Sequence, residues 1–243
     1  MTGGTVGSLF AQCFHLSAAE RKTLLVAGAA AGMTAIFGTP MAAILLAVEI
    51  LLFEWKPRSF VPVVISVLVA AAWRPGLIGD GAMFPGIWPS PDVGWIVAAS
   101  AGIGIVAGLQ TALLSTFLYR VEDLFHRLPV HWMWWPAIGA TVVGVGGLID
   151  ARVLGAGYSN IQSLIDGSMA LRAAIVLLIA KAIVWLVALG SGTSGGVLAP
   201  LLILGGATGY ILGLWLPGSQ GFWAMIGMAG ILSCAMRAPL TGI

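Results

Sequence analysis

Eleven consecutive residues, Gly190-Ser-Gly-Thr-Ser-Gly-Gly-Val-Leu-Ala-Pro200, have the composition of a site that holds an anion without any charged side chain. They combine four glycines, three hydroxyl side chains and a proline, and they lie between two apolar runs. Glycine lets a ligand approach the backbone closely. The run Val197 to Leu212 is predicted to be a helix, whose first N–H groups lack intrahelical partners and carry the positive end of its dipole. The stretch therefore indicates an uncharged anion site.

The elements that must position this stretch are membrane helices. Of 243 residues, 59% are hydrophobic and 8% are charged, against about 25% charged in a soluble domain. Apolar runs of the roughly 20 residues that span a bilayer recur along the chain. We therefore predict an all-α polytopic membrane protein, in which the 34 glycines serve close helix packing. No basic cluster indicates nucleic acid, and Cys13 and Cys234 indicate neither a disulfide framework nor a metal site.

Local signals divide the chain into helices. Ser17-Ala-Ala-Glu20 is a capping box that begins one helix, and Thr39-Pro40 begins another with proline in its favoured first position. The basic loops around Lys56 and Arg120 are expected in the cytoplasm. The helices are predicted over about 1–16, 17–37, 39–53, 59–73, 93–119, 136–149, 169–189, 197–212 and 222–236, with loops over 74–92 and 150–167.

An internal repeat relates the two ends of the chain. An offset of 202 places Gly3, Gly4 and Gly7 on Gly205, Gly206 and Gly209. An offset of 199 places Gly28, Ala30, Pro40 and Ile44 on Gly227, Ala229, Pro239 and Ile243. Paired repeats with broken helices predict a transporter-like fold with its site where the repeats meet.

Three motifs together resemble the CLC family of chloride channels and chloride/proton antiporters. Gly196-Val-Leu-Ala-Pro200 resembles the family's third anion motif, glycine–any–phenylalanine–any–proline. Gly28-Ala-Ala-Ala-Gly32 with Phe37, Pro40 and Glu49 resembles the segment that leads to the family's inner glutamates. Ala235-Met-Arg-Ala-Pro-Leu-Thr-Gly242 resembles the start of a late helix. The resemblance covers nearly the whole chain. It implies a CLC-type transport domain of broken helices and inverted repeats over 1–243, which we expect to be truncated at both ends.

The resemblance also implies which residues bind the anion. By position, the backbone N–H groups of Val197 and Leu198 would coordinate chloride or a similar anion, next to Gly195 and Gly196. Leu198 stands where the family usually has phenylalanine, so the packing beside the pore is expected to differ. The family's serine motif and gating-glutamate motif are expected before Met1, and its coordinating tyrosine after Ile243. No cofactor is implied.

Proton transfer has two candidate residues. Antiporters of this family commonly carry two adjacent glutamates at the relevant helix end, whereas this chain has Glu49-Ile50. Glu49 either transfers protons or caps a neighbouring helix, and we favour the cap. Glu54 could take the proton-transfer role only if the helix ran about one turn longer. Lys181 either adds positive potential near the anion path, or it has a structural role in which it snorkels or pairs with a backbone carbonyl.

These observations favour a channel-like or weakly proton-coupled anion transporter, integral to a prokaryotic plasma membrane and homodimeric through the helices over 40–53 and 59–73. An unrelated secondary transporter of a small anionic solute is the main alternative, and a structural membrane subunit is another. Gly192-Thr-Ser-Gly195 also matches the Gly-x-Ser-Gly of rhomboid-like intramembrane proteases. Such a serine needs a general base, and no histidine follows His131 in the sequence.

Overall fold

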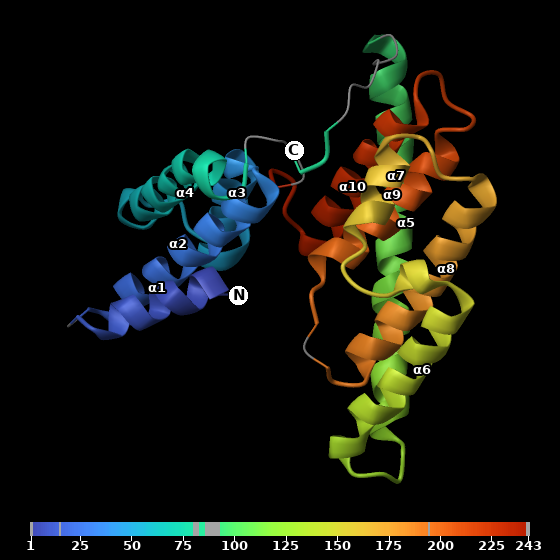
Figure 1. Cartoon of the computed structure of the whole chain (residues 1–243), viewed down its shortest axis with the longest axis horizontal. Helices are drawn as coiled ribbons and strands as arrows, with labels where there is room; N and C mark the ends of the chain where they lie inside the picture. The colour runs from blue at the N-terminus through green and yellow to red at the C-terminus, as the bar shows by residue number, and fades with distance from the viewer. Residues whose placement is uncertain (1, 15, 80–82, 86–92, 194, 242–243) are drawn as a thin grey trace. The chain divides into compact units, whose positions relative to one another are not determined.

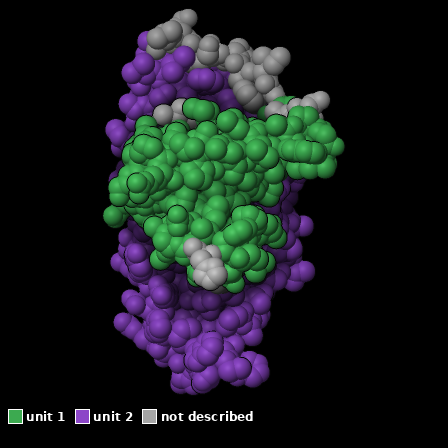
Figure 2. Space-filling view, turned by 90° about the vertical axis from the view of Figure 1, so that its left-hand side faces the viewer, with its two compact units in different colours: residues 1–85, 236–243 green, residues 86–235 purple. Residues whose placement is uncertain are grey.

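In the computed structural model the chain is helical, and no strand occurs in the residues that the structure describes, which are 2–14, 16–79, 83–85, 93–193 and 195–241 (Figure 1). Its contacts divide it into two compact units, residues 1–85 with 236–243 and residues 86–235 (Figure 2). The expectation of a single domain over 1–243 stays a prediction. In chain order the elements are α1 (Thr2–Gln12), α2 (Ala18–Phe37), α3 (Pro40–Leu46), η1 (Ala47–Leu52), α4 (Pro57–Leu77), α5 (Val93–His126), η2 (Trp132–Trp134), α6 (Trp135–Ile149), η3 (Ala151–Val153), α7 (Tyr158–Ile165), α8 (Leu171–Gly190), α9 (Leu198–Leu212) and α10 (Gln220–Met236).

Several of these helices meet the requirements for crossing a membrane. Four segments within the described residues are long and apolar enough: Pro57–Leu77, Gly94–His126, Trp132–Ile149 and Leu171–Gly190. Three further apolar helices are shorter, Pro40–Leu52, Leu198–Leu212 and Gln220–Met236. Apolar helices too short to cross a bilayer are what the broken-helix prediction requires. Their ends would lie within the membrane, where exposed backbone must face protein or a cavity.

The first unit begins with the capping box expected from the sequence. The Ser17 side chain accepts from the Glu20 N–H, and the Glu20 carboxylate accepts from the Ser17 N–H at 2.8 Å. α2 then ends at Gly38, whose φ of 69° lies in the left-handed region. Alanine, valine and leucine side chains of α2, α3, η1 and α4 form the core of this unit: Val26, Ala27, Ala30, Ala43, Ala47, Leu52, Val63 and Val67.

The second unit is arranged along α5, the long helix that runs through it in Figure 1. Its core includes Ala107 and Leu114 of α5, Leu186 of α8, Leu201 and Leu204 of α9, and Ile231 of α10. α9 contributes heavily, with Leu201, Ile203, Leu204 and Tyr210 all buried. A helix that is apolar on every side is held within a protein core or lipid, so α9 is fixed along much of its length.

Three expected boundaries were wrong. α4 continues to Leu77 through Pro75, because both the Ile78 and Gly79 N–H groups donate to the Arg74 carbonyl and complete the last turn. α5 continues to His126 rather than ending at Tyr119, since its charged residues there are exposed and leave the backbone pattern intact. The expected loop over 150–167 contains η3 and α7, and α7 is too short, at 8 residues, for its hydrophobic period to be recognised.

The repeat reappears as two helix pairs with matching glycine contacts. In the first unit, a Cβ added at Gly3 or Gly7 would collide with a backbone carbonyl oxygen of α2, that of Gly28 or Leu24. In the second unit, a Cβ added at Gly205 would collide with the Gly227 carbonyl oxygen of α10, and a Cβ added at Gly209 with the Trp223 carbonyl oxygen. These are the residues that the two offsets pair, so the internal repeat is a repeat of structure.

The glycine contacts predict opposite effects for two Gly→Ala substitutions. At Gly227 the new Cβ meets the Gly205 carbonyl oxygen and the Gly209 backbone, so Gly227→Ala should destabilise the protein by about 1–3 kcal/mol, the usual cost of overpacking. At Gly104 of α5 nothing lies within 4 Å of a new Cβ, so Gly104→Ala should be neutral or stabilising by up to about 1 kcal/mol through helix propensity. Thermal unfolding in detergent measures both, and equal melting temperatures would contradict the backbone contact.

Candidate functional site

The glycine stretch forms the break between α8 and α9. α8 ends at Gly190, and the Ser191 and Gly192 N–H groups donate to the Val187 and Leu189 carbonyls. Gly192 has a φ of 80°, which only glycine adopts readily. The Ser191 hydroxyl donates to the Ala188 carbonyl at 2.7 Å, and the Thr193 hydroxyl donates to the same oxygen. These two hydroxyls therefore close the end of α8, while Ser194 lies outside the described residues.

The predicted anion-binding residues lie at the beginning of α9. Val197 is its N-cap and makes no side-chain capping bond, and Leu198 is its first helical residue. Among the described residues, none accepts a hydrogen bond from the N–H groups of Gly196, Val197 or Leu198. Gly195 and Gly196 are exposed, and apart from the chain neighbours of Gly196 no described residue lies within 4 Å of the position that a Cβ on Gly196 would occupy. The backbone donors at this end of α9 are therefore accessible.

The electrostatic field at this point comes from the backbone. No charged residue occurs between Lys181 and Arg237 in the sequence, so neither the stretch nor α9 carries a formal charge. The helix dipole places roughly half a positive charge at the beginning of α9. The arrangement can therefore attract an anion without an ion pair.

Two side chains that the sequence analysis did not select hold α9 in place. Gln110 of α5 donates to the Leu204 carbonyl at 3.4 Å and accepts from the Thr208 hydroxyl at 2.9 Å. Tyr210 donates its hydroxyl to the Met169 carbonyl at 2.5 Å. A glutamine in the middle of an apolar span is costly and therefore a candidate for a specific role, which is the sequence signal that could have identified Gln110.

Lys181 pairs with backbone carbonyls, the second of the two possibilities given for it. The side chain is buried in α8, and its Nζ donates to the Val153 carbonyl at 2.6 Å and to the Gly155 carbonyl at 2.9 Å. Both acceptors belong to the segment between α6 and α7. The lysine therefore fastens that segment to the helix that leads into the glycine stretch.

Glu49 accepts hydrogen bonds from a turn, at Leu240 and Thr241, and the cap on a neighbouring helix stays a prediction. Glu49 lies in η1, a π-helical turn, and its carboxylate accepts from the Thr241 N–H at 3.1 Å and the Thr241 hydroxyl at 2.8 Å. The Leu240 N–H donates to its other oxygen at 3.4 Å. The carboxylate thus holds the turn that follows Pro239. Sequence alone could not identify the partners, since Leu240 and Thr241 lie 191 and 192 residues away.

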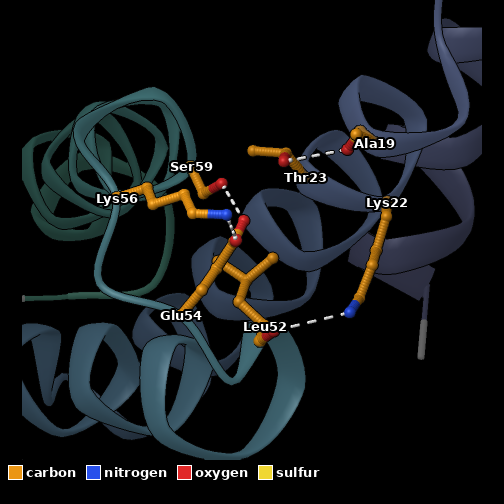
Figure 3. Close-up of polar contacts among 7 residues, drawn as sticks. All are labelled: Ala19, Lys22, Thr23, Leu52, Glu54, Lys56 and Ser59. Atoms are coloured by element: carbon orange, nitrogen blue, oxygen red, sulfur yellow. Dashed lines mark hydrogen bonds and ion pairs between the residues drawn. The ribbon is translucent and has the colours of Figure 1, made fainter.

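Glu54 does not meet the condition set for its proton-transfer role. The helix ends at Leu52 because Phe53 adopts a left-handed backbone with a φ of 57°. Glu54 accepts a hydrogen bond from the Ser59 hydroxyl at 2.5 Å and forms an ion pair with Lys56 at 2.8 Å (Figure 3). Two residues before Glu54, the Leu52 carbonyl accepts a hydrogen bond from Lys22. The hydrogen bonds from Lys56 and Ser59 hold the pKa of the Glu54 carboxyl below its usual value.

Comparison with known proteins identifies the family to which the sequence belongs. The family model described as voltage gated chloride channel matches residues 1–243. The chain belongs to the voltage-gated chloride channel family. The chain is 28% identical to the H+/Cl− exchange transporter ClcA of Citrobacter koseri and covers 54% of that protein. It is 31% identical to the voltage-gated ClC-type chloride channel ClcB of the same organism and covers 59% of it. In these two alignments 99% and 97% of the chain is matched.

Solved structures of the family share the fold. A slow cyanobacterial Cl−/H+ antiporter superposes with a TM-score of 0.84 at 20% identity, and a CLC-type fluoride/proton antiporter with a TM-score of 0.83 at 21% identity. Both superpositions include 99% of this chain, which spans 59% and 60% of the two structures. The chain is therefore an integral membrane protein with part of a CLC fold. These relatives are described as transporters or channels rather than as enzymes.

The contacts of Glu49 predict a structural effect of its removal. Glu49→Ala leaves the Leu240 and Thr241 N–H groups without their acceptor. Hydrogen bonds to charged groups are worth about 1.5–3 kcal/mol, so the free energy of unfolding should fall by about that amount. Glu122→Ala is the control, because Glu122 is exposed and should change it by less than about 0.5 kcal/mol. Chemical unfolding in detergent provides the comparison, and equal effects of the two variants would contradict the stabilising role of these hydrogen bonds.

Proposed function

We propose that the complete protein transports chloride, or a similar small inorganic anion, across the membrane, and that Gly195, Gly196, Val197 and Leu198 form part of its anion site. The observation that carries this proposal is the beginning of α9, where accessible N–H groups have no acceptor among the described residues. Family membership supports the same function, since the relatives include a chloride channel and a chloride/proton exchanger.

The absence of charge in the stretch suits transport. An anion that enters must lose water and regain hydrogen bonds, and it must also leave again. Backbone N–H groups supply directional donors, whereas an arginine or lysine in the same place would add a full opposite charge in a region of low dielectric constant. The site thus provides attraction that remains moderate enough for release.

We also propose that coupling to protons is weak or absent. Isoleucine stands at position 50, beside Glu49, and cannot carry a proton. The Glu49 carboxylate accepts hydrogen bonds from Leu240 and Thr241. A lowered pKa keeps Glu54 ionised near neutral pH, whereas proton transfer is fastest when the pKa is near the working pH. The homodimer implied by the resemblance stays a prediction.

Anion binding through the backbone predicts that the N–H groups matter more than the side chains. Gly196→Pro removes an N–H and fixes φ near −65°, which should displace the adjacent donors of Val197 and Leu198. One lost hydrogen bond to a charged ligand corresponds to about tenfold or more in affinity. Calorimetric titration of chloride into the full-length protein in detergent should show that weakening.

Two matched variants keep the N–H groups. Gly196→Ala adds only a Cβ, at a position with nothing within 4 Å, and Val197→Ile enlarges a side chain that is 38% exposed. Both should bind chloride nearly as the wild type does. If a correctly folded Gly196→Pro binds chloride with unchanged affinity, the anion is held elsewhere and the proposed site is wrong.

Weak coupling predicts little proton movement against a gradient. In liposomes that contain the full-length protein, a chloride gradient should drive chloride flux without sustained uphill proton transport. Glu54→Gln should leave the pH dependence of that flux around neutral pH unchanged, because the hydrogen bonds from Lys56 and Ser59 lower the pKa of the wild-type carboxyl and so keep it ionised there. Sustained uphill proton transport by the wild-type protein would overturn the proposal, and its loss in Glu49→Gln or Glu54→Gln would identify the group responsible.

A further inference from the structure

Gln110 lies midway along the segment Gly94–His126, the part of α5 that is long and apolar enough to cross a membrane. An amide in that position is costly in hydrocarbon unless it is hydrogen-bonded. Thr111 and Thr116 of the same helix donate their hydroxyls to carbonyls of α5 itself. Gln110 instead bonds to α9, the helix whose beginning carries the proposed anion site.

The Gln110 amide holds two groups of α9 that lie one turn apart. Its Nε2 donates to the Leu204 carbonyl oxygen at 3.4 Å, and its Oε1 accepts from the Thr208 hydroxyl at 2.9 Å. Residues four apart on a helix lie on one face, one above the other, so a single planar amide can reach both. Leu204 is fully buried, and Gln110 and Thr208 are half-buried. The amide is therefore a two-point contact between α5 and α9.

These hydrogen bonds fix a freedom that the apolar contacts of α9 leave open. Gly205 and Gly209 bring α9 against the backbone of α10, which sets the distance between those two helices. Apolar contacts act without direction, whereas a hydrogen bond weakens steeply when its angle or its length departs from the preferred geometry. The Gln110 amide therefore opposes sliding and rotation of α9.

A shift of α9 reaches the anion site because the beginning of the helix is uncapped. Val197 makes no side-chain capping bond, and the N–H groups of Gly196, Val197 and Leu198 have no acceptor among the described residues. Leu198 and Leu204 belong to the same unbroken helix, so these donors move with the backbone that Gln110 holds. A binding group must be held in its productive geometry by the residues that support it.

We propose that Gln110 is a positioning residue for anion binding, which sets the register of α9 and thereby the geometry of the N–H groups at its beginning. The inference rests on the proposed function, because it assigns Gln110 a role in that same site. Gln110 acts through α9 rather than by contact with the anion, since its partners Leu204 and Thr208 lie well inside the helix.

Calorimetric titrations of the full-length protein in detergent test the proposal, with chloride and nitrate as the two probes. Gln110→Met keeps the length of the side chain and removes both hydrogen bonds. It should weaken chloride binding about two- to thirtyfold, the range over which residues outside a binding site modulate affinity. It should also change the ratio of the chloride and nitrate affinities, because a spherical and a planar anion need the N–H groups in different places.

The affinity ratio separates positioning from stability. A variant that only unfolds part of the protein lowers the apparent affinity for both anions by the same factor, the fraction that remains competent to bind. The melting temperature of Gln110→Met should stay close to that of the wild type, because interhelical hydrogen bonds in membranes contribute little to stability on average. The Thr208 hydroxyl also keeps an acceptor in that variant, since the Leu204 carbonyl lies 2.9 Å from it.

Three further variants isolate the amide contact. Thr208→Val removes the hydroxyl that donates to Gln110, so it should shift the affinity ratio in the same direction and add little to the effect of Gln110→Met in the double variant. Thr208→Ser keeps the hydroxyl and should bind both anions as the wild type does. Thr111→Val is the matched control, because it removes a hydroxyl that donates to the Ala107 carbonyl of α5, and it should leave both affinities unchanged.

The outcomes distinguish this role from the anion site itself. Chloride binding that Gly196→Pro weakens and Gln110→Met leaves unchanged would overturn the role of Gln110 and leave the site in place. An unchanged affinity ratio in Gln110→Met, or an equal effect of Thr111→Val, would reduce Gln110 to a structural residue. Absence of chloride binding by the wild type would overturn the proposed function and this inference with it.

Discussion

Backbone-to-backbone contact at glycines is the constraint on which both units depend. In lipid, helices gain nothing from hiding apolar surface from each other, so close packing must supply the attraction. Gly3 and Gly7 bring α1 against α2, and Gly205 and Gly209 bring α9 against α10, with no room for a Cβ at any of the four. α9 carries the proposed anion site at its beginning, so the glycines on its body fix where the free N–H groups lie.

The repeat extends from these helix pairs to the turns that follow them. The second offset pairs Gly38 with Arg237 and Pro40 with Pro239. Gly38 and Arg237 are both left-handed, with φ of 69° and 53°. Glycine adopts this conformation freely, whereas for arginine it costs about 1–2 kcal/mol. The Glu49 carboxylate accepts hydrogen bonds from the turn just after Arg237, and these bonds help to offset the strain.

The polar groups around α9 are of two kinds: side chains that hydrogen-bond to backbone carbonyls and so hold the structure together, and backbone N–H groups without an acceptor among the described residues. Lys181, Gln110 and Tyr210 each donate to backbone carbonyls: Lys181 ties α8 to the segment between α6 and α7, Gln110 ties α5 to α9, and Tyr210 ties α9 to the segment before α8. Ser191 and Thr193 close α8 in the same way. The N–H groups of Gly196, Val197 and Leu198 at the beginning of α9, by contrast, have no acceptor among the described residues. A rigid surround with a few free donors is the arrangement that electrostatic preorganisation requires of an anion site.

The sequence by itself determined the features that depend on composition and on neighbouring residues. The membrane class follows from the scarcity of charge, the beginning of α2 from the Ser17–Glu20 capping box, and the break before α9 from four closely spaced glycines and a proline. The tertiary structure decided which distant groups meet: Glu49 with Thr241, Lys181 with Val153, and Gln110 with Thr208. It also decided that Phe53 ends the π turn and leaves Glu54 in an ion pair with Lys56. Capping and periodicity act within a few residues, whereas a buried polar side chain takes whichever partner the packing of separate helices brings within about 3 Å.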